Sequence, residues 1–399
     1  MYPAGKIVAA GDRRGAHRVA LAHPVPSQQT RAEVHAGDAI PARLARDWVD
    51  LAAEASEPNC FSEYWFIAAS LATLGRAAGV RIVEVRRGAE LIGVIPLAVA
   101  GNYGRTPVRV IQNWVHHQMF LGVPLVRREE ETAFWDAVLG LLDDADWAPN
   151  FLHVTGLVAD GPVHVGLRAA ATALGRAAPI VHRESRALLE SKLEPAAYYE
   201  QAVRPKKRKE IRRLRNRLGE LGTLSSRCLE VEADLYGWCD AFLALEQAGW
   251  KGKEGSALAC TAETEAFFRQ AVVAAWEKGA LQFRRLDLDG RPIAMLVNFL
   301  SPPGSFSFKT AFDEAFAQFS PGVLIQLDNL AILDRAEIGW MDSCACEQHP
   351  MIDSLWRERR EIVRVTVRLK GFRRAIVYAI CRALETGWAA LRRTAGRSR

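Results

Sequence analysis

The chain has 399 residues and a net charge of +6, with 49% hydrophobic and 25% charged residues. This length allows two ordinary domains, and the composition is typical of a soluble globular protein with a sizeable core. The longest apolar run, 91–101, contains Pro96 and falls short of the roughly 18 residues that a membrane-spanning helix needs. Seven cysteines, an odd number in a long chain, argue against a disulfide framework and favour a reducing cytoplasm.

The charge is unevenly distributed. Residues 204–217 carry +8 and residues 357–399 carry +10, so the rest of the chain carries −12. Two concentrated basic segments on an acidic body indicate anionic partners, such as phosphates, nucleic acid or lipid headgroups. The alternative is that both are solvated helical faces.

The first half of the chain begins with residues 1–30, which are rich in Gly, Pro, Ser and Gln and are expected to be disordered or irregular. Apolar residues at helical spacing then alternate with segments of period two. Helices are expected at 42–55, 62–75 and 131–145, and strands at 80–101 (a hairpin), 108–114, 117–126 and 150–158.

The second half repeats this plan, with a helix at 263–279 and a hairpin at 280–301. Gly88 matches Gly290 at an offset of 202, and Gly93 matches Ala294 at an offset of 201. We interpret this as two copies of one α/β unit in tandem, joined through a basic helix at 204–221. The alternative is a chance similarity between two amphipathic hairpins.

A strand at 305–313 precedes a helix predicted over 320–336. Ser320 suits the N-cap of this helix and Pro321 its first turn, while Gly322 lets a ligand approach the backbone. Together with Val323 these are the candidate residues for binding the donor. Free N–H groups at a helix N-terminus bind phosphate or pyrophosphate well. An ordinary Ser-Pro helix start is the alternative.

Residues 200–360 resemble GNAT-superfamily acyltransferases of the CelD-like type, which are associated with cellulose or envelope-polysaccharide genes; a bacterial ceramide synthase-like member is one version of this resemblance. The pieces that carry it are "RPKKRKEIRRLRNRLGELG", "LEQAGWKGKEG", "LDLDGRPIAMLVNFL", "FKTAFDEAFAQFSPG" and "MDSCACEQHPMIDSLWRERR". The segment "QFSPGV" departs from the usual Gln/Arg-x-x-Gly-x-Gly/Ala cradle, which leaves open whether the donor is acyl-CoA, an acyl carrier protein or an aminoacyl-tRNA.

The resemblance implies an α/β (α+β) fold with two tandem GNAT-like domains, in which mixed sheets are flanked by helices. It places a degenerate first domain at 31–199, a second domain with the acyl-donor site at 200–370, and a basic amphipathic helix and tail at 371–399. It also implies acyl-CoA as a co-substrate and no metal.

Acyl transfer to an amine needs a base and hydrogen-bond donors for the thioester oxyanion. His349, in a loop that follows a predicted strand at 338–345, is the first candidate for the base, oriented by Asp342 or Asp353. Glu246 is a candidate for a second acid or base. Lys309 is a candidate for contact with a phosphate or the acceptor; an exposed strand lysine is the alternative.

Candidate substrate-binding residues come from two segments. Trp250 and Lys251 open a Gly-rich loop that could close over a substrate or could simply end a helix. Trp114 and His116 lie at a strand end in the first copy. His116 and His117 would point to opposite faces of a strand, so at most one of them lines the site.

Two rival interpretations involve the cysteines before His349. Cys344-x-Cys346-x-x-His349 offers three soft ligands, but structural zinc sites usually have C-x₂₋₄-C spacing. Cys344 as a nucleophile is chemically possible, although a buried cysteine usually acts as a small hydrophobe. We therefore favour the general base and expect no metal.

The tail is predicted to begin with a half-buried edge strand at 361–370 and to continue as a helix. One apolar row recurs along this helix at steps of three and four, flanked by arginines: Phe372, Ile376, Ile380, Leu384, Trp388 and Leu391. A basic amphipathic helix of this kind is typical of a membrane-surface helix, so 371–395 is expected to bind an anionic membrane. Docking on the protein's own core is the alternative.

Three functions remain open. The first is an acyl-CoA-dependent N-acyltransferase at the cytoplasmic membrane face, acting on a lipid amine, such as a sphingoid base converted to a ceramide-like amide, or on an envelope precursor. The second is an aminoacyl-tRNA-dependent transferase, although a nucleic-acid partner is not favoured. The third is a non-catalytic accessory protein of polysaccharide biosynthesis.

Overall fold

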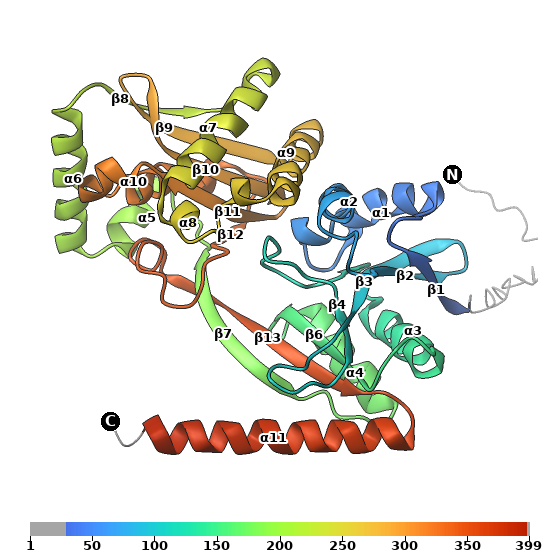
Figure 1. Ribbon diagram of the computed structural model, residues 1–399. Helices are drawn as coiled ribbons and strands as arrows, with labels where there is room; N and C mark the ends of the chain where they lie inside the picture. Colours follow the sequence, from blue (N-terminus) through green and yellow to red (C-terminus); the bar gives the residue numbers. More distant parts are fainter. Residues whose placement is uncertain (1–28, 397–399) are drawn as a thin grey trace, which may run out of the picture.

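The computed structural model describes residues 29–396, with side chains described as far as residue 387. The expectation for residues 1–28 lies outside this range. Two units follow one another along the chain and lie side by side (Figure 1). The first contains β1 (Thr30–Ala36), α1 (Ala42–Glu54), α2 (Tyr64–Thr73), β2 (Arg81–Arg87), β3 (Glu90–Ala100), β4 (Val110–Asn113), β5 (Leu125–Val126), α3 (Glu131–Asp144), β6 (Phe151–Val158) and α4 (Pro162–Ala173).

The strand β7 (Ile180–Leu189) and the helix α5 (Pro195–Ala202) lead into the second unit. That unit contains α6 (Pro205–Gly219), β8 (Leu224–Cys228), α7 (Leu235–Ala248), α8 (Trp250–Lys253), α9 (Ala262–Glu277), β9 (Leu281–Leu288), β10 (Arg291–Ser301), β11 (Gly304–Phe312), α10 (Pro321–Asp328) and β12 (Trp340–Asp342). β13 (Glu358–Arg368) and α11 (Phe372–Gly396) end the described chain.

The described strands form one 13-stranded mixed sheet in the order β1-β2-β3-β4-β6-β13-β7-β12-β11-β10-β9-β8, with β5 beside β3. All neighbours are antiparallel except two pairs, β4 with β6 and β11 with β12. Each unit thus has an antiparallel meander followed by one parallel strand. The predicted α/β class, with two similar units in tandem and a C-terminal helix, is confirmed.

The two hairpins show the repeat in detail. Gly88 and Gly290 both turn their hairpins at positive φ, 60° and 79°, where a residue without Cβ is favoured. Directly after each turn the second strand has a bulge, at Ile92 in β3 and at Ile293 in β10, so that neither isoleucine has a cross-strand partner on β2 or β9. The bulges lie 201 residues apart, as the sequence offset predicts.

The units also exchange a strand. β7 follows the first unit in the chain but pairs with β12, whereas β13 follows the second unit but pairs with β6. β7 and β13 are also neighbours, and they run between the two units as long strands (Figure 1). The segment predicted as an edge strand at 361–370 therefore lies in the middle of the sheet.

The units share an aromatic core. Phe66 of α2 packs edge-on against Phe267 of α9 with ring centroids 5.3 Å apart, and Phe61 packs against Phe306 of β11 at 5.1 Å. All four rings are fully buried. The relative position of the two units is thus fixed by packing as well as by the sheet. In the part of the chain that the structure describes, no helix has the length and apolar character to cross a bilayer.

Candidate active site

A cavity opens where β11 and β12 separate. The two strands pair only between Gly304–Phe306 and Trp340–Asp342. Immediately beyond this stretch β11 has a bulge at Phe308, which has no partner on β10. A bulge bends its strand, and residues that follow the pairing on both strands line a cavity of about 970 Å³.

The equivalent gap in the first unit is filled by its own chain. The side-chain amide of Asn113, at the end of β4, donates hydrogen bonds of 2.8 Å to the carbonyls of Gly122 and Thr155. The N–H of Gly122 donates to the carbonyl of Gly156, and Leu121 beside it is buried. Only a smaller cavity of about 250 Å³ remains there.

The large cavity lies at the junction of the units and has mainly apolar walls. Phe308, Phe312 and Val323 come from β11 and α10, and Ile352 comes from the loop after β12. The first unit contributes Phe120. Large clefts lined by aromatic and aliphatic side chains, with few polar groups, are typical of small-molecule sites.

Two lysines and one glutamate form the charged part of the site. Lys309 of β11 lines the cavity, and burial lowers its pKa to about 8 although Glu246 opposes the shift. Glu246 of α7 lies behind it, with a side chain that is 1% exposed and an Oε1 that is 2.8 Å from Lys251 Nζ. Burial acts to raise the pKa of Glu246, but the two lysines hold it below its ordinary value. The charged form of Glu246 is therefore favoured, and its role as an acid or base stays a prediction.

His349 lines the same cavity from the loop after β12. Burial lowers the pKa of its imidazole, so the neutral form is favoured near neutral pH. Its Nδ1 is buried and has no hydrogen-bond partner among the described residues. A buried ring nitrogen without a hydrogen-bond partner is unfavourable for the folded protein.

Asp342 was expected to orient His349, but it is bound by two arginines instead. It is fully buried, and its carboxylate accepts hydrogen bonds from Arg186 at 2.8 Å, Arg360 at 3.1 Å and the backbone N–H of Cys344 at 2.9 Å. These groups use both oxygens, so Asp342 does not orient His349. Asp353 fits the predicted orienting role better than Asp342, because its charge acts on His349 and its N–H donates to the His349 carbonyl.

The helix after β11 is shorter than predicted. α10 ends at Asp328 and continues as a 3₁₀ helix to Asp334. Ser320 is its N-cap residue, but in the left-handed conformation (φ 53°) and without a side-chain capping bond. Pro321 has no N–H, and the N–H groups of Val323 and Leu324 bond to the Ser320 carbonyl.

The N–H of Gly322 is the one left free at this helix start, within the described part of the chain. Ser320, Gly322 and Val323 all line the cavity. An added Cβ on Gly322 would lie 2.9 Å from the Met351 sulfur, so this residue must be small. The start of α10 therefore offers one free backbone N–H to a ligand, fewer than the sequence suggested.

The predicted substrate-binding residues fall into two groups. Trp250 and Lys251 line the cavity, and Trp250 is half exposed. Trp114 is buried in the first unit, and His116 stacks on buried rings, where burial lowers its pKa to about 3. His117, its neighbour in the chain, lines the cavity instead.

Three polar residues of the cavity were missed in the sequence. Gln326 of α10 is 1% exposed and donates hydrogen bonds to the hydroxyls of Ser307 at 3.1 Å and Thr310 at 3.2 Å. A polar residue in the otherwise apolar run of this helix was the available signal. The three side chains hold α10 against β11 at the cavity wall.

The cysteines give little support to the rival interpretations. Burial raises the pKa of Cys344 well above its usual range, which disfavours a nucleophilic thiolate. Cys346 is exposed. Cys344, Cys346 and His349 do not form a metal-ligand group among the described residues.

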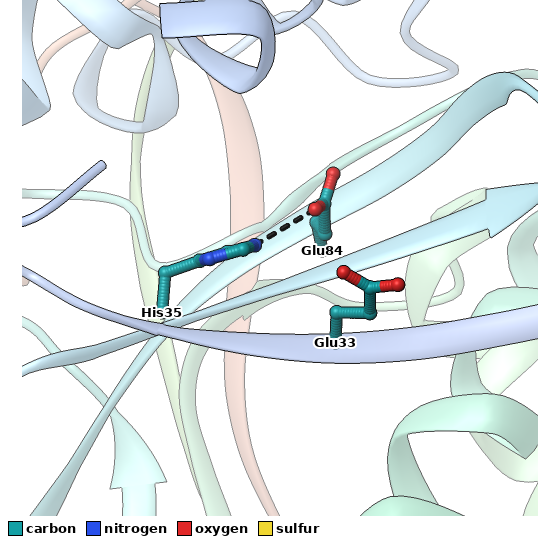
Figure 2. Close-up of side chains that lie close together, drawn as sticks. All are labelled: Glu33, His35 and Glu84. Atoms are coloured by element: carbon teal, nitrogen blue, oxygen red, sulfur yellow. Dashed lines mark hydrogen bonds and ion pairs between the residues drawn. The ribbon is translucent and has the colours of Figure 1, made fainter. Parts of the chain in front are cut away.

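One other group has ligand-like geometry. Glu33 and His35 of β1 and Glu84 of β2 have ligand atoms within 4.8 Å of one another (Figure 2). Each carboxylate already has a cation, since Arg31 lies 3.1 Å from Glu33 and Arg86 lies 2.7 Å from Glu84. His35 bonds to Glu84 at 2.7 Å, so the group is an ion-pair network on strands that do not line the cavity.

One known protein family matches part of the chain. Residues 205–344 match the family described as "Acetyltransferase (GNAT) domain". This range begins at α6 and ends at Cys344, so it covers the second unit and most of the cavity. The similarity to GNAT acetyltransferases thus lies in the second unit. No curated protein matches the chain.

Solved structures show the same fold over both units. FemX is 10% identical with a TM-score of 0.53, over 82% of this chain and 96% of FemX. A conserved protein of unknown function from Bacteroides thetaiotaomicron VPI-5482 is 11% identical with a TM-score of 0.52, over 85% of this chain and all of that one. A tandem GNAT protein from the clavulanic acid biosynthesis pathway is 17% identical with a TM-score of 0.46, over 86% of this chain and all of that one.

Proposed function

We propose that the second-unit cavity transfers an acyl group from acyl-CoA to the nitrogen of an amine. The observation that carries this proposal is the position of His349. His349 lines the same cavity as Lys309 and Gly322, and burial favours the neutral form of its imidazole.

In the proposed reaction the amine nitrogen attacks the thioester carbonyl, the C–N bond forms, and the C–S bond breaks. His349 accepts the proton that the amine loses, and the thiolate of CoA takes up a proton as it leaves. The Lys309 ammonium and the Gly322 N–H stabilise the oxyanion that develops on the carbonyl oxygen. Glu246 keeps Lys309 charged below about pH 8, because its carboxylate favours the ammonium form.

The cavity walls support a lipid acceptor. Phe120, Phe308 and Phe312 offer apolar surface, and about 970 Å³ is large enough for a chain beside the reacting groups. A long-chain amine such as a sphingoid base, converted to a ceramide-like amide, is the acceptor we favour, at the cytoplasmic face of the membrane. An amine of an envelope precursor is the other member of this class.

The test is a coupled measurement of thiol release and amide formation with palmitoyl-CoA and sphinganine. We expect activity in the wild type and a loss of about 100-fold or more in His349→Ala, since general bases contribute at least that much. His182→Ala is the matched control, because His182 lies on β7 outside the cavity. Equal rates in wild type and His349→Ala would reject the base. No thermal stabilisation by any CoA species would reject the donor.

A second candidate, transfer from aminoacyl-tRNA, is favoured by one surface. Five basic residues of α6 are exposed, namely Lys206, Lys209, Arg212, Arg213 and Arg217, and the described ion pairs include none of them. Such a face suits a polyanion. If tRNA is the donor, binding will weaken steeply with salt, and reversing these charges will abolish it.

A further inference from the structure

The helix α11 is attached to the first unit by one face only. Val377 and Tyr378 pack on the cluster that contains Tyr103 and Phe151, and Cys381 is buried in that cluster. Glu385 bonds to the Tyr103 hydroxyl. α11 therefore has a fixed inner face.

An arginine reinforces this attachment. The Arg374 guanidinium donates to the carbonyl of Asp143 at 2.8 Å and to that of Ala148 at 2.6 Å. These carbonyls lie at the end of α3 and just beyond it, where a helix has acceptors without intrahelical partners. The helix cannot roll over without breaking these bonds.

The opposite face of α11 presents a row of large apolar side chains to solvent. Phe372 is 82% exposed, and Ile376, Ile380 and Leu384 are 45%, 55% and 43% exposed. They recur every four residues, so they lie along one side of the helix. We call these four residues the outer row.

The charges around the outer row are positive. Arg373 is exposed beside it, and the one acidic residue within 372–387, Glu385, is bonded to Tyr103 and Arg382. The helix itself, Phe372–Gly396, contains five arginines and one glutamate, a net charge of +4. A second copy of the chain would bring two such basic surfaces together, whereas an anionic bilayer has the complementary charge.

We propose that the outer row of α11 binds the surface of a bilayer that contains anionic phospholipid, with the helix lying in the plane of the interface. The four side chains enter the acyl boundary and the exposed Arg373 meets the phosphates. In Figure 1, α11 runs along one side of the molecule, clear of the second unit, so a flat surface can reach it along its length. This inference does not depend on the proposed reaction.

The test is co-sedimentation of the full chain, without donor or acceptor, with vesicles of phosphatidylcholine alone or mixed with phosphatidylglycerol. We expect binding only to the mixed vesicles. The double variant Ile376→Glu/Ile380→Glu should lower the partition coefficient by at least about tenfold, because two buried side chains are lost. Arg373→Gln should weaken binding mainly at low salt.

Tyr236→Glu is the matched control, because Tyr236 is 61% exposed but lies on α7 of the second unit; it should bind as the wild type does. Thermal unfolding of each variant checks its fold. Equal binding to both vesicle types, or unchanged binding of the double variant, would overturn the proposal. It would also be overturned if the wild type sediments as a dimer that the double variant cannot form, with no vesicle binding.

Discussion

Lys309 Nζ lies 3.8 Å from Glu246 Oε1, with both side chains almost completely removed from solvent. A lysine whose pKa is lowered to about 8 by burial remains mostly cationic at neutral pH only because the glutamate opposes the shift. This pair sets the charge on the wall of the cavity.

The pH dependence of kcat at saturating substrates should therefore be bell-shaped. His349 must be neutral, so the rate falls as pH drops through its pKa, which burial places below the usual value. Lys309 must be charged, so the rate falls as pH rises through about 8. Lys309→Arg should retain activity and move the alkaline limb upward, since arginine stays protonated; an unmoved limb would show that Lys309 does not act as the cation.

Removal of Glu246 should affect both stability and the alkaline limb. Glu246→Ala leaves Lys309 and Lys251 without their shared anion, which costs about 3 kcal/mol of unfolding free energy for a buried pair. The pKa of Lys309 falls, so the alkaline limb moves to lower pH. Urea unfolding and the pH profile measure the two effects. Asp240 lies on α7 like Glu246 but is exposed, where it pairs with Arg269 of α9. Asp240→Ala should therefore leave the stability and the alkaline limb nearly unchanged.

Gly322 should control donor binding. A side chain there meets the Met351 sulfur at 2.9 Å and Phe312 at 3.3 Å. Gly322→Val should therefore abolish the thermal stabilisation by palmitoyl-CoA, because it crowds the free N–H. Gly237→Val, at a helical glycine with open space around it, is the control. Gly322→Ala combined with Met351→Ala should bind better than Gly322→Ala alone; no difference would remove Met351 from the site.

Asp342 should matter for stability. Its carboxylate, held by Arg186 and Arg360, joins β12 to β7 and β13, where the two units meet. Asp342→Asn leaves two guanidinium groups without their anion and should lower the free energy of unfolding by about 3 kcal/mol. Asp353→Asn, whose residue pairs with Arg359 nearer the surface, should have a much smaller effect in the same urea titration.

The sequence contained enough information for the repeat, because hairpins and helices are local and their glycines recur at a fixed offset. It did not reveal the place of β13. Alternation of apolar and polar residues indicates a strand, but its neighbours, β6 and β7, are chosen by contacts some two hundred residues away.

The candidate site divides in the same way. Each of the three residues has a local signal: His349 lies in a loop after a strand, Lys309 in a strand and Gly322 at a helix start. The fold brings them to one cavity. Asp342 was misjudged because its arginine partner Arg186 lies 156 residues earlier. The choice between His116 and His117 depended on which of them packs on the buried rings of Phe66 and Phe267 and which reaches the cavity.

The exchange of β7 and β13 has a consequence for how the chain is made. During synthesis the first unit emerges from the ribosome long before Glu358–Arg368, yet β6 pairs with that segment. Until then one edge of its sheet stays open, and open edges invite wrong pairing. Chains cut short before residue 358 should therefore aggregate. The unit that is translated first is the last to be completed.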